Sequence, residues 1–258
     1  MPALITGASS GIGLELARLC AADRHDVVLV ARRTDALQSL ARELEGVGVR
    51  AHAIASDLAA PGAVAALVDR VRQLGLEIDI LVNNAGYGTF GRFAETPLDG
   101  ELAMIRVNIV ALTELTKRLL PPMIARRRGR ILNLASTAAF VPGPLMAVYY
   151  ATKAYVLSFS EAIGEELRDT GVTVTALCPG PTASGFQARA RIEESKLVAG
   201  RKLPTSREVA QAGYRAMMAG TPVAIPGFLN KLTAFAPRVT PRRLMPGIVR
   251  RMQELRTS

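Results

Sequence analysis

A glycine-rich segment near the start of the chain constrains its fold more than any other feature. The segment Thr6-Gly7-Ala8-Ser9-Ser10-Gly11-Ile12-Gly13 follows a short apolar run at residues 3–5 and precedes a helical pattern of apolar residues at 14–19. Between a strand and a helix, glycines let the backbone turn sharply and approach a phosphate group, whose charge the helix N-terminus attracts. Although a tight structural turn can also use these glycines, the context predicts an α/β domain that begins with a phosphate-binding turn.

The chain continues with alternating strand and helix patterns up to about residue 226. Short apolar runs predict further strands at residues 27–31, 49–55, 78–82, 130–135, 172–177 and 222–225. Periodic apolar residues predict helices at 34–45, 62–74, 99–126 and 208–218, and one through Tyr149 that ends near Gly171. Because no linker or repeat interrupts the alternation, we expect one three-layer, doubly wound α/β domain over residues 1–226.

The composition is that of an ordinary globular protein. The 258 residues are 49% hydrophobic and 21% charged, which suits one large domain with a sizeable core. No apolar run approaches the ~18 residues that span a bilayer, and no basic leader precedes the first strand, so we expect a cytoplasmic protein. Cys20 and Cys178 are expected to be buried free thiols, and with only His25 and His52 as histidines we expect no metal site.

Positive charge gathers at the C-terminal end of the chain, whose formal net charge is +10. No zinc-finger, helix-turn-helix or aromatic RNA-binding pattern accompanies it, so we do not expect a nucleic-acid partner. We describe residues 227–258 as a basic, apolar C-terminal extension. Its cations, against the single acid Glu254, are Lys231, Arg238, Arg242, Arg243, Arg250, Arg251 and Arg256.

Arg32 and Arg33 follow the predicted strand at residues 27–31. In dinucleotide-binding folds the end of this second strand faces the adenosine ribose, where an acid favours NAD and an arginine accommodates the 2′-phosphate of NADP. Because no acid stands there, the sequence favours NADP. A solvated arginine pair before a helix that opens at Thr34 would give the same pattern.

Tyr149 and Lys153 form the pair with the clearest chemical meaning. At i and i+4 of a helix, the phenol and the ammonium group lie on one face, one turn apart. At about 4 Å and an effective dielectric constant near 20, their attraction is roughly 4 kcal/mol, enough to lower the pKa of Tyr149 toward neutral pH. Ser136 ends a predicted strand, from which its hydroxyl can reach the same site and hold a substrate oxygen.

Other polar or rigid positions also follow predicted strands. Asp57-Leu58 can contact an adenine, and the amides and small residues of Asn83-Asn84-Ala85-Gly86 leave room for a ribose. Asn108 is unusual in the middle of a helical pattern and is expected to have a hydrogen-bonding partner. The turn Cys178-Pro179-Gly180-Pro181-Thr182 directs Thr182 toward the sheet edge. The polar connection at 183–205 has the length of a lid or substrate loop.

These residues stand in an order and at separations that resemble the short-chain dehydrogenase/reductase family. The resemblance covers roughly residues 3–226 and implies a Rossmann-type fold with a seven-stranded parallel sheet, and hydride transfer on a nicotinamide cofactor. It also implies a catalytic tetrad. In that tetrad Tyr149 is the general acid/base, Ser136 orients the substrate oxygen, Lys153 binds the nicotinamide ribose and tunes Tyr149, and Asn108 holds a water in a proton relay.

The expected cofactor contacts lie at the carboxyl ends of the predicted strands. They are Gly7, Ser9, Ser10, Gly11, Ile12, Gly13, Arg32, Arg33, Asp57, Leu58, Asn84, Ala85, Gly86, Tyr149, Lys153, Pro179, Gly180 and Thr182. The resemblance is incomplete at Ser10, where some NADP-dependent members carry a basic residue. Phosphate selectivity therefore rests on the two arginines.

The extension at 227–258 also departs from the family, whose common ending is shorter. Its mixture of apolar and basic residues suits a cover over the substrate cleft, a subunit contact or a membrane-surface helix. Because Pro237, Pro241 and Pro246 interrupt it, we expect the extension to pack on the protein or a sister subunit and to bind anionic lipid only weakly.

The sequence thus predicts an NADP(H)-dependent oxidoreductase that interconverts a ketone or aldehyde and an alcohol. The alternatives are an NAD-dependent hydroxysteroid-type dehydrogenase and a non-catalytic binding protein that senses the cofactor or associates with a membrane. Apolar residues near the predicted site, namely Phe140, Val141, Met146 and Phe186, favour a small, hydrophobic substrate. We expect a homodimer or homotetramer and do not favour membrane association.

Overall fold

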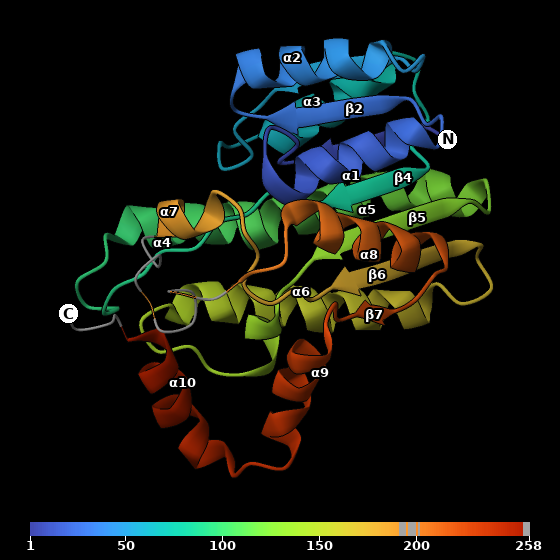
Figure 1. The fold of residues 1–258 in the computed structure, drawn as a ribbon. Helices are drawn as coiled ribbons and strands as arrows, with labels where there is room; N and C mark the ends of the chain where they lie inside the picture. Colours follow the sequence, from blue (N-terminus) through green and yellow to red (C-terminus); the bar gives the residue numbers. More distant parts are fainter. Residues whose placement is uncertain (191–194, 196–199, 201, 255–258) are drawn as a thin grey trace.

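A seven-stranded parallel sheet forms the centre of the protein (Figure 1). The computed structural model describes residues 1–190, 195, 200 and 202–254. The strands run in the order β3-β2-β1-β4-β5-β6-β7, so the chain winds outward in both directions from β1 and β4. Their bounds are β1 Ala3–Thr6, β2 Val27–Ala31, β3 Ala51–Ala55, β4 Ile80–Asn83, β5 Gly129–Leu134, β6 Val172–Leu177 and β7 Val223–Ala224. The expected three-layer, doubly wound fold is confirmed.

Helices cover both faces of the sheet. Their bounds are α1 Gly11–Ala22, α2 Thr34–Glu45, α3 Ala63–Gln73, α4 Leu98–Ile105, α5 Leu112–Ala125, α6 Ala147–Glu166, α7 Phe186–Ala190, α8 Ser206–Met218, α9 Phe228–Phe235 and α10 Met245–Gln253. Helices α1, α2 and α8 pack on one face, and α3, α5 and α6 pack on the other. Because side chains alternate along a strand, Ala3 and Ile5 face the first group while Leu4 faces the second.

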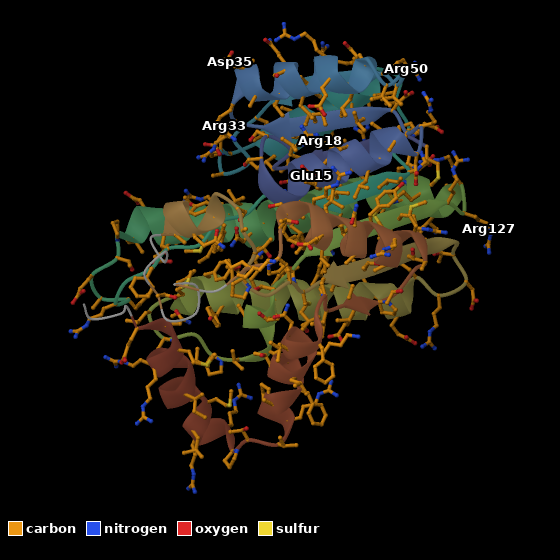
Figure 2. All side chains as sticks on the ribbon, in the orientation of Figure 1. Glu15, Arg18, Arg33, Asp35, Arg50 and Arg127 are labelled. Carbon is orange, nitrogen blue, oxygen red and sulfur yellow. The ribbon has the colours of Figure 1, made fainter. Side chains whose placement is uncertain are left out.

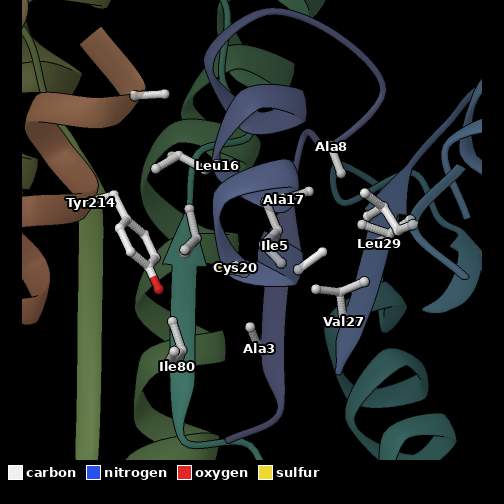
Figure 3. Packing of buried hydrophobic residues seen from close by; sticks show 14 of the residues in the cluster. Ala3, Ile5, Ala8, Leu16, Ala17, Cys20, Val27, Leu29, Ile80 and Tyr214 are labelled. Atoms are coloured by element: carbon white, nitrogen blue, oxygen red, sulfur yellow. The ribbon is translucent and has the colours of Figure 1, made fainter. Parts of the chain in front are cut away.

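Figure 3 shows the core on the first face, where Leu16 and Ala17 of α1 lie against strand residues such as Ile5. Tyr214 of α8 reaches into this core, and its hydroxyl donates a hydrogen bond of 2.7 Å to Oδ2 of Asp23. This bond satisfies the polar end of a mostly buried ring. Cys20 and Cys178 are buried free cysteines, as expected.

The prediction of one regular helix at 99–126 is wrong in one respect, because a π-helical turn interrupts it. The chain forms α4, then a π-helical turn at Arg106–Ala111, then α5. The apolar periodicity continues through the wide turn, so the pattern alone does not reveal it. Such turns occur mostly as single interruptions of α-helices, frequently at functional sites.

The C-terminal extension folds as a helical hairpin, which we define as residues 228–254. It consists of α9, short 3₁₀ turns at Ala236–Arg238 and Arg242–Leu244, and α10. Pro237 and Pro241 lie at the interruption between the two helices, as expected, whereas Pro246 lies in the first turn of α10, where proline is tolerated. Figure 1 shows α9 and α10 as two arms that project away from the sheet beneath α6. Among the described residues, no helix is both long and apolar enough to cross a membrane.

The connection at 183–205 is only partly described. The helix α7 lies within it, and a parallel bridge between Ala183 and Thr205 joins its two ends. Part of the predicted substrate loop lies outside the described residues, namely 191–194, 196–199 and 201. The same holds for residues 255–258, which include Arg256.

Candidate active site

A cavity of about 810 Å³ lies at the carboxyl ends of the strands, where ligands bind in doubly wound sheets. Its walls include Gly7, Ser9, Ser10, Gly11, Ile12, Arg32, Arg33, Asp57, Leu58, Asn84, Ala85, Gly86, Ser136, Tyr149, Lys153, Pro179, Gly180 and Thr182. Among the predicted site residues, only Gly13 and Asn108 are not part of the described lining. The fold therefore brings together residues that the sequence separates by up to 175 positions, from Gly7 to Thr182.

The glycine turn forms one end of this cavity. Gly7 and Gly11 have φ angles of +66° and +60°, in a region that residues with a side chain rarely adopt. Helix α1 begins at Gly11, its N-cap Ser10 makes no side-chain cap bond, and no acid lies in its first turn. The N-terminus of α1 is therefore suited to an anion. Gly13 has a packing role, because a Cβ there would collide with the Asn84 amide and Gly7 O.

The end of β4 is tied to the glycine turn by Thr6. The Thr6 hydroxyl accepts hydrogen bonds of 3.0 Å from the backbone N–H groups of Asn84 and Ala85 and donates one of 3.2 Å to Val82 O. The Asn84 amide donates to Thr6 O at 2.9 Å and to Gly7 O at 3.2 Å. Asn84 therefore supports the turn. The sequence contained Thr6, but we had not assigned it this role.

Arg32 and Arg33 differ in their hydrogen bonds. Arg33 Nη2 donates to the backbone oxygen of Ser9 at 2.8 Å and to its hydroxyl at 3.3 Å, which joins the end of β2 to the glycine turn. Arg32 is exposed and also lines the cavity. Two cations thus stand beside the turn, with no acid at the end of β2. This arrangement fits an extra phosphate group better than a free ribose hydroxyl.

Ser136, Tyr149 and Lys153 meet at the other end of the cavity. Ser136 follows β5 and caps a 3₁₀ turn by accepting a hydrogen bond from Ala138 N at 3.1 Å. The Ser136 side chain lies close enough to the Tyr149 hydroxyl to stabilise its phenolate form. Lys153 is buried on the same helix, and its Nζ donates to Leu134 O at 2.6 Å.

Burial shifts the pKa values of both Tyr149 and Lys153. Burial raises the pKa of Tyr149 to about 12, and the Ser136 side chain offsets this only in part. Burial lowers the pKa of Lys153 to about 8. The expected lowering of the Tyr149 pKa by Lys153 is therefore wrong, because desolvation of the buried phenolate dominates.

Asn108 has the hydrogen-bonding partners that its position in the helical pattern led us to expect. In the π-helical turn, its amide nitrogen donates to Tyr87 O and to Thr152 Oγ1, each at 3.0 Å. Its Oδ1 accepts from Tyr87 N at 3.2 Å. A Cβ on Gly86 would lie 3.0 Å from Asn108 Oδ1 and 3.6 Å from Lys153 Nζ, so the glycine lets these side chains approach the β4 end.

An apolar wall faces Tyr149. Val141, Met146 and Phe186 line the cavity, whereas Phe140 packs in a neighbouring cluster. The Phe186 ring lies 5.3 Å from the Tyr149 ring. Further residues of the cavity lining come from the C-terminal hairpin: Thr233, Ala236, Met245, Ile248, Val249 and Met252. A cover over the substrate cleft is one of the three roles that the sequence suggests for this extension, and the apolar spacing 248, 249 and 252 is part of that signal.

The chain is similar to known dehydrogenases and reductases. Residues 2–195 match the model of the short chain dehydrogenase family. The ketoacyl reductase HetN of a Nostoc species is 34% identical over 215 residues, which are 83% of this chain and 74% of that protein. The granaticin polyketide synthase putative ketoacyl reductase 1 of Streptomyces violaceoruber is 40% identical over 192 residues, covering 73% of this chain and 70% of the relative.

Solved structures extend the similarity over the C-terminal hairpin. A short-chain dehydrogenase from Sphingobium yanoikuyae in complex with NADPH has a TM-score of 0.83 and 32% identity, covering 100% of this chain and 98% of that one. The bulky-bulky ketone specific alcohol dehydrogenase from Comamonas testosteroni has a TM-score of 0.79 and 28% identity, covering 100% and 96%. The sequence match, the fold and these relatives show that this chain belongs to the short-chain dehydrogenase family.

Proposed function

We propose that this protein is an NADP(H)-dependent oxidoreductase that interconverts a ketone or aldehyde and the corresponding alcohol. The observation that carries the proposal is one continuous cavity with the glycine turn and two arginines at one end and Ser136, Tyr149 and Lys153 at the other. Such a cavity has a phosphate-binding end and a proton-donating end. The NADPH-bound relative from Sphingobium yanoikuyae supports the choice of cofactor.

The residues present fit a dinucleotide along the cavity. The N-terminus of α1 would hold the pyrophosphate, Arg32 and Arg33 the 2′-phosphate, and Asp57 with Leu58 the adenine. Asn84, Ala85, Gly86 and Lys153 would surround the nicotinamide ribose, with Pro179, Gly180 and Thr182 beyond it. When bound, NADPH supplies the hydride. The absence of an acid at the end of β2 weighs against the NAD-dependent alternative.

Tyr149 acts as general acid in the reductive direction. Its raised pKa keeps the phenol protonated near neutral pH, so it has a proton to give to the substrate oxygen as negative charge develops there. Ser136 donates a second hydrogen bond to that oxygen and orients it. Lys153 stabilises the resulting phenolate, and Asn108 holds the water that returns a proton. In the oxidative direction the same groups act in reverse.

The apolar wall opposite Tyr149 favours a small hydrophobic carbonyl or alcohol substrate, with the loop 183–205 and the hairpin on its outer side. Relatives named as ketoacyl reductases support a 3-oxoacyl group as a first candidate. We further propose a homodimer or homotetramer, because Leu98, Leu102 and Val110 on the α4–α5 side are 69%, 38% and 50% exposed. Light scattering after size exclusion measures that state.

A carbonyl and alcohol panel assayed with NADPH, NADH, NADP⁺ and NAD⁺ tests the function. We expect NADPH oxidation with hydrophobic ketones or 3-oxoacyl thioesters, and little with NADH. Turnover with NADH alone would favour the hydroxysteroid-type alternative. Tight NADPH binding without turnover across the panel would favour a non-catalytic cofactor sensor.

A further inference from the structure

The C-terminal hairpin has one side packed on the protein and a second side without a described partner. On the packed side, Met245 and Val249 of α10 join a buried cluster with Met146 and Tyr150 beside the active site. Ala234 of α9 is also buried. These contacts anchor the hairpin, so its uncovered side belongs to the folded protein.

The uncovered side carries large apolar residues. Phe228, Leu232 and Phe235 are spaced at i, i+4 and i+7 of α9, so they form a stripe along one face of that helix. Scattered single apolar residues are normal at a protein surface, whereas a cluster of this kind marks an interaction site. Their exposed fractions, with those of their neighbours, are Phe228 74%, Leu229 77%, Leu232 50%, Phe235 54%, Val239 71% and Leu244 51%.

Cations surround this apolar surface. Each is exposed, and none forms an ion pair with a carboxylate in the described part of the chain. They are Lys231, Arg238, Arg242, Arg243, Arg250 and Arg251. Figure 2 shows blue nitrogen ends of side chains reaching outward from both arms of the hairpin. The surface is therefore apolar and strongly cationic at once.

The same hairpin also lines the active-site cavity. Ile248 and Met252 of α10 line the cavity with Tyr149 and are also 44% and 38% exposed. Thr233 of α9 lines the cavity from the other arm. Both arms of the hairpin thus form part of the cavity wall, with apolar side chains from α10.

A second copy of the chain is a poor match for this surface. An isologous contact between two hairpins would bring their six cations against each other, and like charges across an interface are unfavourable. A chain with net charge +10 offers little acidic surface elsewhere for a head-to-tail contact. Nucleic acid would match the cations but not the aliphatic and aromatic stripe.

We propose that the uncovered side of the hairpin docks on the surface of an anionic lipid bilayer, with its apolar residues at the headgroup boundary and its cations on the lipid phosphates. Amphipathic helices with apolar and Lys/Arg-rich faces bind membranes in this way. The prolines led us to expect weak lipid binding, but they divide the hairpin without covering its apolar residues. Docking would hold the hairpin wall of the cavity next to the membrane, and only the relevance of this placement to a substrate rests on the proposed function.

Sedimentation of the full chain with vesicles at about 0.15 M salt tests the docking, because bare surface charge is largely screened there. We expect binding to phosphatidylcholine vesicles that contain phosphatidylglycerol and little binding to phosphatidylcholine alone. The hairpin variants are Phe228→Ser/Leu229→Ser and Arg242→Gln/Arg243→Gln. We expect each to weaken the partition coefficient about tenfold or more.

Matched control variants change exposed residues elsewhere. They are Phe93→Ser, at a site 67% exposed, and Arg42→Gln/Arg70→Gln on α2 and α3, and both should leave partitioning unchanged. Thermal unfolding of every variant verifies folding. The proposal is overturned by absence of sedimentation with anionic vesicles, or by equal losses in hairpin and control variants. Hairpin variants that dissociate an oligomer without changing partitioning would overturn it in favour of a second copy. Since partitioning is measured without cofactor or substrate, failure of the proposed reaction leaves this test intact.

Discussion

The ammonium nitrogen of Lys153 lies 5.7 Å from the centre of the Tyr149 ring and donates its short hydrogen bond to Leu134 O. The described hydrogen bond of the lysine thus goes to a backbone oxygen at the end of β5. Burial acts on both groups, raising the pKa of Tyr149 and lowering that of Lys153. Both shifts favour the neutral forms, so Tyr149 retains the proton that the proposed general acid would deliver.

Replacing Tyr149 by Phe should reduce kcat by about 10²- to 10⁴-fold, because general acid catalysis contributes an effect of that size. NADPH affinity should remain, since the change removes one oxygen and little volume. Tyr155→Phe is the matched control: its hydroxyl lies 2.9 Å from Thr113 Oγ1, and Tyr155 does not line the described cavity. Steady-state kinetics and NADPH fluorescence titration measure both effects. Unchanged kcat in the Tyr149 variant would remove Tyr149 from the mechanism.

The lowered pKa of Lys153 predicts a pH dependence of stability. Between about 8 and its ordinary value of 10.5, the unfolded chain binds a proton at Lys153 that the folded chain has released. The free energy of unfolding therefore increases as pH rises from about 8 to 10.5, because the folded chain no longer holds a buried charge at Lys153. Below pH 8 that buried charge lowers the stability of the folded chain. The full effect is about 3 kcal/mol.

Urea unfolding of the wild type and Lys153→Met from pH 7 to pH 10.5 isolates this contribution. Between about pH 8 and 10.5, the free energy of unfolding of the variant should fall by about 3 kcal/mol relative to that of the wild type. The reason is that methionine has no proton to release, so the variant does not share the increase of the wild type. Lys117→Met, at an exposed site on α5, is the control and should show no such change. A difference between Lys153→Met and wild type that is constant with pH would contradict the buried-cation assignment.

The alternation of strands and helices could be predicted because it depends on local apolar patterns. The amphipathic helix α2 begins at Thr34 and ends at Glu45, as expected from its spacing. The π-helical turn could not be predicted, since it preserves apolar periodicity while Asn108 bonds to Tyr87, 21 residues earlier. The position of Asn108 in the helical pattern predicts that it has a hydrogen-bonding partner, but it does not identify Tyr87 as that partner.

The sequence could identify most of the residues that line the cavity, but not their environment. The helix spacing of Tyr149 and Lys153 places both on one side of α6, yet it does not reveal that Lys153 Nζ turns to Leu134 O. Likewise, the apolar spacing in α10 indicates that one face of the helix is buried, but it does not identify the residues that cover this face. Only the tertiary fold shows Val249 in the cluster around Tyr150.

Arg32→Ala should reduce the preference for NADPH over NADH. Hydrogen bonds to charged groups contribute about 1.5 to 3 kcal/mol, which corresponds to roughly 10- to 150-fold in affinity. NADH affinity should change little, because the lost partner is the 2′-phosphate. Titration of both cofactors gives the ratio.

Arg33→Ala is the companion variant. Arg33 is already bonded to Ser9, so its loss should loosen the glycine turn and weaken both cofactors together. A preference that persists in Arg32→Ala and disappears in Arg33→Ala would assign the phosphate to Arg33.

Val249 of α10 offers a test of the hairpin as a wall of the substrate site. Val249 lines the cavity and is buried beside Met146 and Tyr150, so Val249→Phe should fill substrate space. We expect kcat/KM for bulky hydrophobic ketones to fall about tenfold or more relative to that for a small ketone, because added volume in a packed pocket is strongly discriminating. Leu244→Phe, at a site 51% exposed outside the described lining, should leave the ratio unchanged. Equal losses for large and small ketones in Val249→Phe, at unchanged thermal stability, would argue that α10 does not border the bound substrate.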